Sequence, residues 1–522
     1  MTTINEKRKH NLRLPISRIP DEILSTIFCD LRSNFVSTAA IKILPRQHGL
    51  ECLEGWVTIT YVCHAWREVA LDTSLLWCHI DVSSQVYNWM PELLRRSKES
   101  PLTIAVDWTV IEPDGGLDLL KEVKRHFGRA RELVVDDVHD AIMYEIFSSE
   151  SQTNFQNLET LDIYHAYDPP LLLNDSHLRA ERLRSLSLHY CAIDWNSKFL
   201  QDLTHLRLVD IPEGCRLGSF DFILVLSKIP ALETLHFSDL LENEKVETHR
   251  ATKIHLQHLQ RLHMESQVPE MEHFLSSLVV PRSCKLSLER TGREGDSDTT
   301  CDKFRAILSW ISNHFRVPTP SDRDHEQYIR SFRLEFHPNI GEEDFKIEGF
   351  CDVLSHEQLK NADPIFEFII NWSYWDHNFD LNLRTFLSLL PLSRITFLDV
   401  YDDVEKSPEF WMVAFGSIQT LKTVYLRTAT APFWQALITP ANNHNGTIVK
   451  SLPFPTLALV HVKEYYPNFQ LILDTLRVRS ELGGTQLQDL CFSSVGPVPP
   501  APVMTQLGEL VSHIDIEYDN WP

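Results

Sequence analysis

Leu183-Arg-Ser-Leu186-Ser-Leu188 is one of five copies of a pattern in which an apolar residue is followed, after two others, by two apolar residues in alternation. The other copies begin at Leu158, Leu203, Leu232 and Leu259, so that successive copies start 25, 20, 29 and 27 residues apart. Alternation with a period of two is typical of strands. Each copy therefore predicts one short strand with its leucines buried on one face.

Helical patterns occupy the segments between these predicted strands. An apolar run over residues 222–226 precedes Pro230, and apolar residues recur at helical spacing over residues 304–315. Strand, helix and next strand thus alternate at the period of about 20–29 residues that leucine-rich repeats have. The chain resembles this class, which implies a mixed α/β fold: a leucine-rich-repeat-like right-handed solenoid, or horseshoe, over residues 81–522.

The repeat becomes irregular after about Ser266. Further copies begin at Ile329, Leu421 and Leu487, but with wider gaps, and we expect polar insertions near residues 291–300 and 338–352. Only Cys191 occupies the Asn/Cys position that completes the strict consensus. We therefore predict a degenerate solenoid with long loops.

Strand residues that alternate with the buried leucines point toward the open face of such a solenoid. This column is mixed and contains histidines and arginines, which suit a polar or acidic protein target. For any single residue, a merely solvated position is the alternative, because hot spots are a minority in real interfaces. Our candidates for contact with a protein substrate are Asp162, Tyr164, His189, Arg207, His236 and His263.

The N-terminal stretch Ile19-Pro-Asp-Glu-Ile-Leu-Ser-Thr-Ile-Phe-Cys-Asp-Leu31 predicts an amphipathic helix. Pro20 suits the first helical position, and the carboxylates of the first turn favour the positive end of the helix dipole. The apolar residues from Ile23 to Leu31 form a broad stripe that must be buried somewhere. A second helix is predicted over Tyr61–Ala70, and Leu76-Trp77 follows as an apolar anchor.

These segments resemble, in order, the three motifs of the F-box family: residues 19–24, residues 61–67 and Leu76-Trp77. The link over residues 32–55 is longer than is usual in the family, and Leu14-Pro15 is a rival for the opening motif. Together with the degenerate repeats, the pattern is similar to F-box proteins of the fungal type. The resemblance implies a small all-α F-box module with an extended inter-helix loop over residues 14–80, and we expect a disordered basic tail over residues 1–13.

If the resemblance holds, the module binds a Skp-type adaptor and through it a cullin–RING ligase, and the solenoid presents a protein substrate for ubiquitin transfer. Trp66 alternatively belongs to the core of the module itself. The residues implied for the adaptor contact or its immediate support are Pro20, Ile23, Leu24, Ile27, Phe28, Val62, Cys63 and Trp66. The rival hypothesis is a leucine-rich-repeat scaffold with no ligase role, in which these helices cap the solenoid.

Composition narrows the classes of binding partner that we expect. The formal charge of -23 opposes nucleic acid and anionic membranes, and no segment approaches a membrane span or a secretion signal. Ten cysteines without a Cys-x-x-Cys pair fit reduced thiols. We therefore expect an intracellular protein, cytoplasmic or nuclear or both, with a protein substrate whose identity the sequence leaves open.

We expect no enzymatic activity, cofactor or metal. The chain has no phosphate-binding glycine loop, no His-Glu-x-x-His and no Gly-x-Ser-x-Gly. The adjacent pairs Cys63-His64 and Cys78-His79 lack the spacing that lets zinc ligands converge. A third hypothesis, an enzyme hidden in the C-terminal half, predicts a deep pocket around Asp376 and His377, within an aromatic cluster over residues 372–377.

Overall fold

A computed structural model describes residues 3–11, 13–40, 55–82, 89–107, 120–136, 140–147, 155–165, 170–241, 253–291, 301–315, 328–338, 343–371, 379–401, 406–427, 430–439, 452–496 and 498–518. Contacts divide the chain into two compact units, Met1–Arg216 with Lys228–Leu232, and Leu217–Ser227 with Glu233–Pro522. The boundary expected near residue 80 lies within the first unit, where a 3-10 turn, η2 (Ser74–Trp77), leads directly into β1 (His79–Val82).

The first unit begins with a short helix, α1 (Ile4–Asn11), where we had expected a disordered tail over residues 1–13. A local capping signal accounts for the difference. The backbone N–H of Thr3 donates to the Glu6 carboxylate at 2.7 Å, and the N–H of Glu6 donates to Thr3 Oγ1 at 3.3 Å. This reciprocal pair satisfies N–H groups at the start of a helix, and the basic residues of the last turn favour its negative end.

Helix α2 (Asp21–Ala40) begins one residue after Pro20, which was predicted to be the first helical residue, and it continues beyond Leu31. The predicted second helix over Tyr61–Ala70 is interrupted. It consists of α4 (Ile59–Val62) and α5 (His64–Asp72), separated by Cys63 in an extended conformation. Sγ of Cys63 accepts a hydrogen bond from the backbone N–H of Trp66 at 3.5 Å, so this thiol caps α5.

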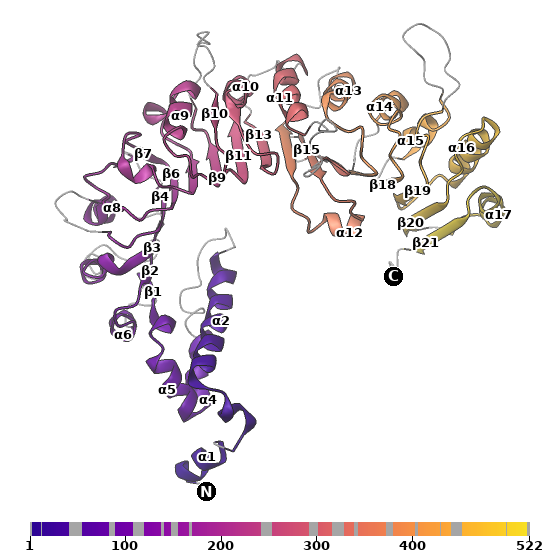
Figure 1. Ribbon diagram of the computed structural model, residues 1–522. Coiled ribbons are helices and arrows are strands. Elements are labelled where there is room, and N and C mark those ends of the chain that lie inside the picture. Colours follow the sequence, from indigo (N-terminus) through magenta and orange to yellow (C-terminus); the bar gives the residue numbers. More distant parts are fainter. Residues whose placement is uncertain are drawn as a thin grey trace. The chain divides into compact units, whose positions relative to one another are not determined.

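A parallel ladder of strands follows in the first unit, in the order β1, β2, β3, β4, β6, β8 (Figure 1). The predicted strands at Leu158, Leu183 and Leu203 are β4, β6 and β8, and their leucines are buried. Strands β5 (Leu171–Leu173) and β7 (Cys191–Ile193) form a separate small parallel pair. In the chain they follow β4 and β6, respectively. The remaining bounds are β2 (Leu102–Asp107), β3 (Ala130–Asp136), β4 (Thr160–Tyr164), β6 (Ser185–His189), β8 (His205–Val209), α6 (Met90–Arg96) and α8 (Asp140–Phe147).

Several strands end in the same unusual backbone conformation. The residue after β6, β8 and β9 (Thr234–Ser238) has a positive φ: 54° at Tyr190, 52° at Asp210 and 46° at Asp239. This left-handed region is uncommon outside glycine, and Asp tolerates it better than most residues. The three strands thus share this ending as well as the leucine pattern that predicted them.

The ladder of the second unit departs from a simple repeat. Its order is β9, β11, β13, β16, β15, β14, β17, β18, β19, β20, β21, so the chain order reverses at β14, β15 and β16. β15 (Glu343–Phe350) runs antiparallel to both neighbours. The polar insertion predicted over residues 338–352 therefore contains a strand, which interrupts the strand–helix alternation expected of the solenoid.

Helices cover one face of this ladder. α9 (Ser219–Leu226) and α11 (Cys301–His314) are the two helices predicted from apolar spacing, and the described members of their apolar faces are buried. The exception is α12 (His356–Leu359), a single helical turn on the opposite face of the sheet (Figure 1). No described helix is long and apolar enough to cross a membrane.

The remaining elements of the second unit have the following bounds. Its strands are β10 (Ile254–His255), β11 (Arg261–Ser266), β12 (Leu278–Val279), β13 (Lys285–Arg290), β14 (Ser331–Pro338), β16 (Phe366–Asn371), β17 (Phe397–Tyr401), β18 (Thr423–Arg427), β19 (Leu459–Lys463), β20 (Asp489–Val495) and β21 (His513–Tyr518). Its helices are α10 (Val268–Ser276), α13 (Phe379–Leu389), α14 (Pro408–Ala414), α15 (Ala431–Ala436), α16 (Phe469–Glu481) and α17 (Ala501–Leu510).

Candidate protein-interaction surfaces

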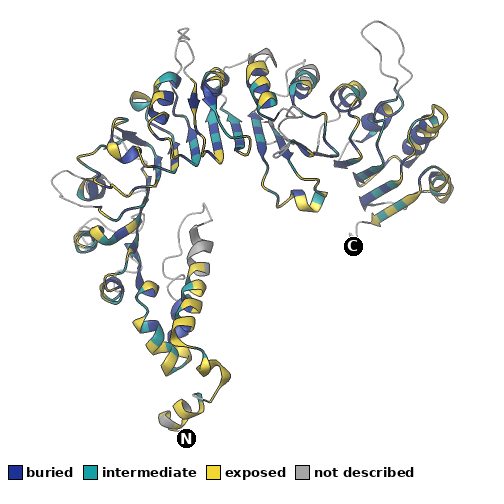
Figure 2. Ribbon diagram, viewed as in Figure 1, coloured by how far each residue is buried: buried dark blue, intermediate teal, exposed yellow. Residues whose placement is uncertain are grey.

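The apolar stripe of α2 divides into a buried row and an exposed row (Figure 2). Leu24 and Phe28 are buried, and the Phe28 ring packs against Trp66 of α5 with ring centroids 5.2 Å apart. Ile23, Ile27 and Leu31 follow one another at four-residue spacing, so they share one face of the helix. They are exposed by 53%, 46% and 37%.

Helix α4 adds two more exposed side chains, Tyr61 and Val62, the latter exposed by 58%. Scattered exposed apolar residues are ordinary, whereas a continuous row along one helix is typical of a protein-binding surface. We call Ile23, Ile27, Leu31, Tyr61 and Val62 the apolar helix face.

The structure thus sorts the eight residues implied for the adaptor contact into two groups. Ile23, Ile27 and Val62 are exposed together with Pro20, as a direct contact requires. Leu24, Phe28, Cys63 and Trp66 are buried or half-buried and support the module from inside. The alternative role of Trp66, as part of the core of the module, is the one that its contact with Phe28 favours.

The polar face of the first unit carries residues that were predicted to point outward. They occupy matching positions on neighbouring strands. Asp162, Ser187 and Arg207 are paired in register on β4, β6 and β8, and Tyr164 and His189 are paired two residues later. The Tyr164 and His189 rings stack with centroids 4.2 Å apart, and Nε2 of His189 lies 2.8 Å from Oδ2 of Asp210. Tyr164 remains 41% exposed, as an interface anchor would be.

In the second unit, one polar row crosses the ladder in register. Each member pairs with the next across neighbouring strands, so the row occupies a single height on the face opposite most of the helices. It comprises His236, His263, Ser287, Glu367, Glu348, Arg333, Asp399, Tyr425, His461, Cys491 and Asp515. The predicted candidates His236 and His263 lie at its start, and their rings are 4.1 Å apart.

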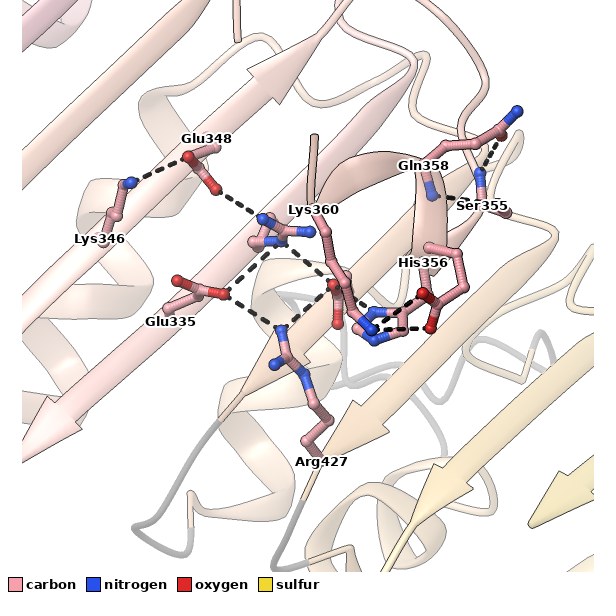
Figure 3. Close-up of polar contacts among 11 residues, drawn as sticks. Glu335, Lys346, Glu348, Ser355, His356, Gln358, Lys360 and Arg427 are labelled. Atoms are coloured by element: carbon pink, nitrogen blue, oxygen red, sulfur yellow. Dashed lines mark hydrogen bonds and ion pairs between the residues drawn. The ribbon is translucent and has the colours of Figure 1, made fainter. Parts of the chain in front are cut away.

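The middle of this row is a network of ion pairs (Figure 3). Lys346 bridges Glu367 at 2.7 Å and Glu348 at 3.0 Å, and Nη1 of Arg333 reaches Glu348 at 3.2 Å. Nε of Arg333 lies 3.2 Å from Oδ2 of Asp399. Arg427 also joins the network, through Glu335 at 3.1 Å and Asp399 at 3.4 Å.

Asp399 is the most buried charge of the network, with no exposed side-chain surface. Burial by itself raises the pKa of a carboxyl group. Here the hydrogen bond from His356 and the charges of Arg427 and Arg333 outweigh burial, so the pKa of Asp399 lies below its usual value. The carboxylate is therefore ionised and paired rather than neutral.

Helix α12 covers this charged centre and adds a small apolar core on the same face. The His356 ring stacks on Tyr425 with centroids 3.9 Å apart, and Leu359 packs with Phe350, Phe397 and Tyr425. Ser355 and Gln358 form a reciprocal capping pair that starts the helical turn. Part of the face that we predicted to be open is consequently covered by the chain itself.

Most of this network could not be predicted from the sequence. Arg333, Glu348 and Asp399 belong to strands far apart in the sequence, and one of those strands was predicted to be a loop. In the repeat copy that begins at Ile329, the alternation of strand residues does predict that Arg333 lies on the polar face. This one residue of the network could therefore have been found from the sequence. The alternative enzyme site around Asp376 and His377 lies outside the described residues.

Comparison with known proteins gave no family model and no curated protein that matches the chain. Among solved structures, the chain is similar to one entitled "Crystal structure of TLR13-ssRNA13 complex", at 12% identity and a TM-score of 0.30. The similarity covers 83% of this chain and 48% of that one, so this chain spans about half the length of the matched chain. A TM-score this low defines neither the fold nor the function of the present protein.

Proposed function

We propose that this protein is the substrate-recognition subunit of a Skp–cullin–F-box type ubiquitin ligase. In this proposal the apolar helix face binds a Skp-type adaptor, and the polar faces of a degenerate leucine-rich-repeat solenoid bind a protein substrate. The chain itself performs no bond chemistry. It raises the effective concentration of substrate lysines near the ubiquitin-carrying enzyme, which converts an intermolecular encounter into a local one.

The apolar helix face is the observation that carries the proposal. Burial of apolar surface is worth about 25 cal/mol per Å². A partner that covers the exposed isoleucines and the valine therefore gains binding free energy. The sequence motifs that resemble the F-box family lie on the same helices. Ile23 and Val62, one from each of the first two motifs, are both exposed by more than half.

The polar faces support the second half of the proposal. Parallel strands in register, with helices confined largely to one face, leave a continuous surface of polar side chains on the other. Tyr164, His189 and Arg207 belong to this surface in the first unit. Mixed aromatic and basic residues of this kind are common anchors of protein interfaces.

One observation favours the rival scaffold hypothesis, in which the helices only cap the first strand. Trp77 is buried directly before β1, its Nε1 donates to the carbonyl of Ala70 at 2.9 Å, and the Arg96 guanidinium lies 4.3 Å from its ring centroid. The helices are therefore firmly joined to the ladder. A pure cap, however, needs a polar outer face, whereas α2 presents isoleucines.

Co-purification with a Skp-type adaptor tests the proposal. The full-length protein should retain the adaptor, and the double variant Ile23→Asp, Ile27→Asp should lose it, because two carboxylates cannot be desolvated in an apolar contact. Leu172→Asp is a matched control, since Leu172 is 48% exposed but lies on β5. It should bind like the wild type.

Circular dichroism should show that all three proteins have the same secondary structure content. No adaptor binding by the folded wild type would favour the scaffold hypothesis. Equal binding by wild type and double variant would place the adaptor contact away from the apolar helix face and would overturn the proposal in its present form.

A further inference from the structure

We propose that His263, Glu265 and Glu289 bind a divalent transition-metal ion of the Zn²⁺ type. One ligand atom from each of the three side chains lies within 4.8 Å of the others, and all three residues are half-buried. An ion placed between them would be within about 3 Å of each atom, and small side-chain rotations can shorten this to the about 2.0–2.2 Å of Zn–N and Zn–O bonds. This inference does not depend on the ligase proposal.

Strand register is what brings the three residues together. His263 and Glu265 are two positions apart on β11, so their side chains share one face of the sheet. Glu289 of β13 is the in-register neighbour of Glu265. This register sets the two carboxylates beside the imidazole of His263 on one face of the sheet.

The hydrogen bonds of His263 orient it as a ligand. Oγ of Ser287 donates its hydrogen to the Glu367 carboxylate at 2.7 Å, so toward Nδ1 of His263, 3.0 Å away, it can only accept. Nδ1 therefore carries the proton, and we assign Nε2 as the ligand atom. A second-shell partner of this kind, which fixes the tautomer and the ring orientation, is usual for metal-binding histidines.

Two neighbours support this arrangement. The pKa of Glu367 is lowered, because hydrogen bonds from Lys346 and Ser287 outweigh the opposing effect of burial, so Glu367 is an ionised acceptor for Ser287. The His236 ring lies 4.1 Å from the His263 ring and restricts its rotation. The relay from Glu367 through Ser287 to His263 is thus held in place from both sides.

The ligand set determines which ions fit. One imidazole and two carboxylates suit Zn²⁺ and related first-row ions better than Ca²⁺ or Mg²⁺, which prefer oxygen ligands alone. Three protein ligands leave a tetrahedral ion one further position. Because the site lies on the polar face of β11 and β13, that position is open to water or to a side chain of a bound protein.

Metal titration of the full-length protein tests the site. After treatment with EDTA and its removal, we expect calorimetry with Zn²⁺ to show one tight site above the weak background of other histidines. The variant Glu265→Gln, Glu289→Gln should bind Zn²⁺ at least about 100-fold more weakly, since loss of a single outer-shell partner already costs about 10–100-fold. Absorption spectra of Co²⁺ at the site should show tetrahedral d–d bands in the wild type only.

A matched control is His513→Ala with Asp515→Asn. These residues repeat the His-x-carboxylate spacing on β21 but belong to no described group of three converging ligands. The control should bind Zn²⁺ like the wild type. Ser287→Ala should retain the stoichiometry and weaken binding about 10–100-fold, which identifies Ser287 as a positioning residue.

Thermal unfolding gives a second readout, because an ion that binds only the folded state raises its stability. Zn²⁺ should raise the melting temperature of the wild type and of the His513 control, but not that of the double glutamine variant. Absence of a stoichiometric site in the wild type would overturn the proposal. Equal affinity in the wild type and the folded glutamine variant would do so as well.

Discussion

Nδ1 of His356 lies 3.1 Å from Oδ2 of Asp399, which links a single turn of helix on the polar face to a fully buried carboxylate in the sheet. Stacking of the same histidine ring on Tyr425 places α12 over strands β17 and β18. This link stabilises the segment that connects β15 to β16, where the chain departs from a regular repeat. The turn of helix thereby covers part of the charged row beneath it.

The Asp399→Asn variant should reduce the free energy of unfolding of the second unit by about 3 kcal/mol at pH 7, since it breaks a buried ion-pair network. The pKa of Asp399 is below its usual 3.8. Between the lower folded pKa and pH 3.8, the folded protein therefore binds fewer protons than the unfolded chain. The stabilisation is therefore complete above pH 3.8 and is lost as the pH falls through the lower folded value. Urea unfolding across this range measures both effects.

Asp474→Asn serves as the control for this prediction, because Asp474 is 55% exposed on α16 and its ion-pair partner lies 3.9 Å away. Its unfolding free energy should match that of the wild type within about 0.5 kcal/mol. A difference between wild type and Asp399→Asn that stays constant down to pH 2 would show that the charge of Asp399 contributes nothing.

Truncation of two neighbouring residues on α2 should reduce the stability of the helical module by very different amounts. Phe28→Ala should destabilise the helical module by about 3–5 kcal/mol, because Phe28 is 1% exposed and packs on Trp66. Ile27→Ala should cost little, because Ile27 is 46% exposed. Thermal unfolding and limited proteolysis of the full chain compare them, and equal destabilisation would contradict the assignment of a buried and an exposed row.

Arg479 should contribute strongly to the free energy of unfolding although it makes no ion pair among the described residues. Its guanidinium is 2% exposed, and Nη1 and Nη2 donate to the carbonyls of Leu437, Pro453 and Phe454 at 2.8–2.9 Å. Burial lowers the pKa of Arg479 to about 10. Arg479→Met leaves the carbonyls of Leu437 and Pro453 without this donor, at about 1–3 kcal/mol each, whereas the carbonyl of Phe454 still accepts from the Leu457 N–H, so we expect a loss of at least about 2 kcal/mol.

The matched control for Arg479→Met is Arg477→Met, on the same helix, where the side chain is 48% exposed. Differential scanning calorimetry should show a clear drop in melting temperature for the first variant and almost none for the second. Equal melting temperatures would mean that water replaces the guanidinium without loss.

Two buried thiols should be chemically inert in the folded protein. Burial raises the pKa of Cys191 and of Cys284 to about 12, and the thiolate is the reactive form. At pH 8 both should be alkylated by iodoacetamide at least about tenfold more slowly than the half-buried Cys215, as peptide mass spectrometry can measure. Equal rates in the native state would contradict the packing, and urea should abolish the difference.

Much of the local structure could be predicted because its causes are local. The alternation after Leu158, Leu183 and Leu203 specified strands whose leucines are buried, and Pro20 with an acidic first turn specified where α2 begins. Each of these signals depends on residues within one helical turn or one strand.

The missed features depend on residues distant in sequence or on a single local contact. β15 looked like a polar insertion because its charged residues, such as Lys346 and Glu348, are satisfied by partners on other strands. The break at Cys63 leaves no trace in the apolar periodicity, which continues across it. The convergence of His263 and Glu289 follows from strand register, which no periodicity within one strand specifies.

Hydrogen exchange of the full-length protein, with and without a Skp-type adaptor, tests the central claim most directly. We predict that the adaptor slows exchange in α2 over Asp21–Leu31 and in α4, and leaves the strands of the second unit unchanged. Binding of the adaptor without protection of α2 and α4, or no binding at all, would contradict the claim that the apolar helix face is the docking surface.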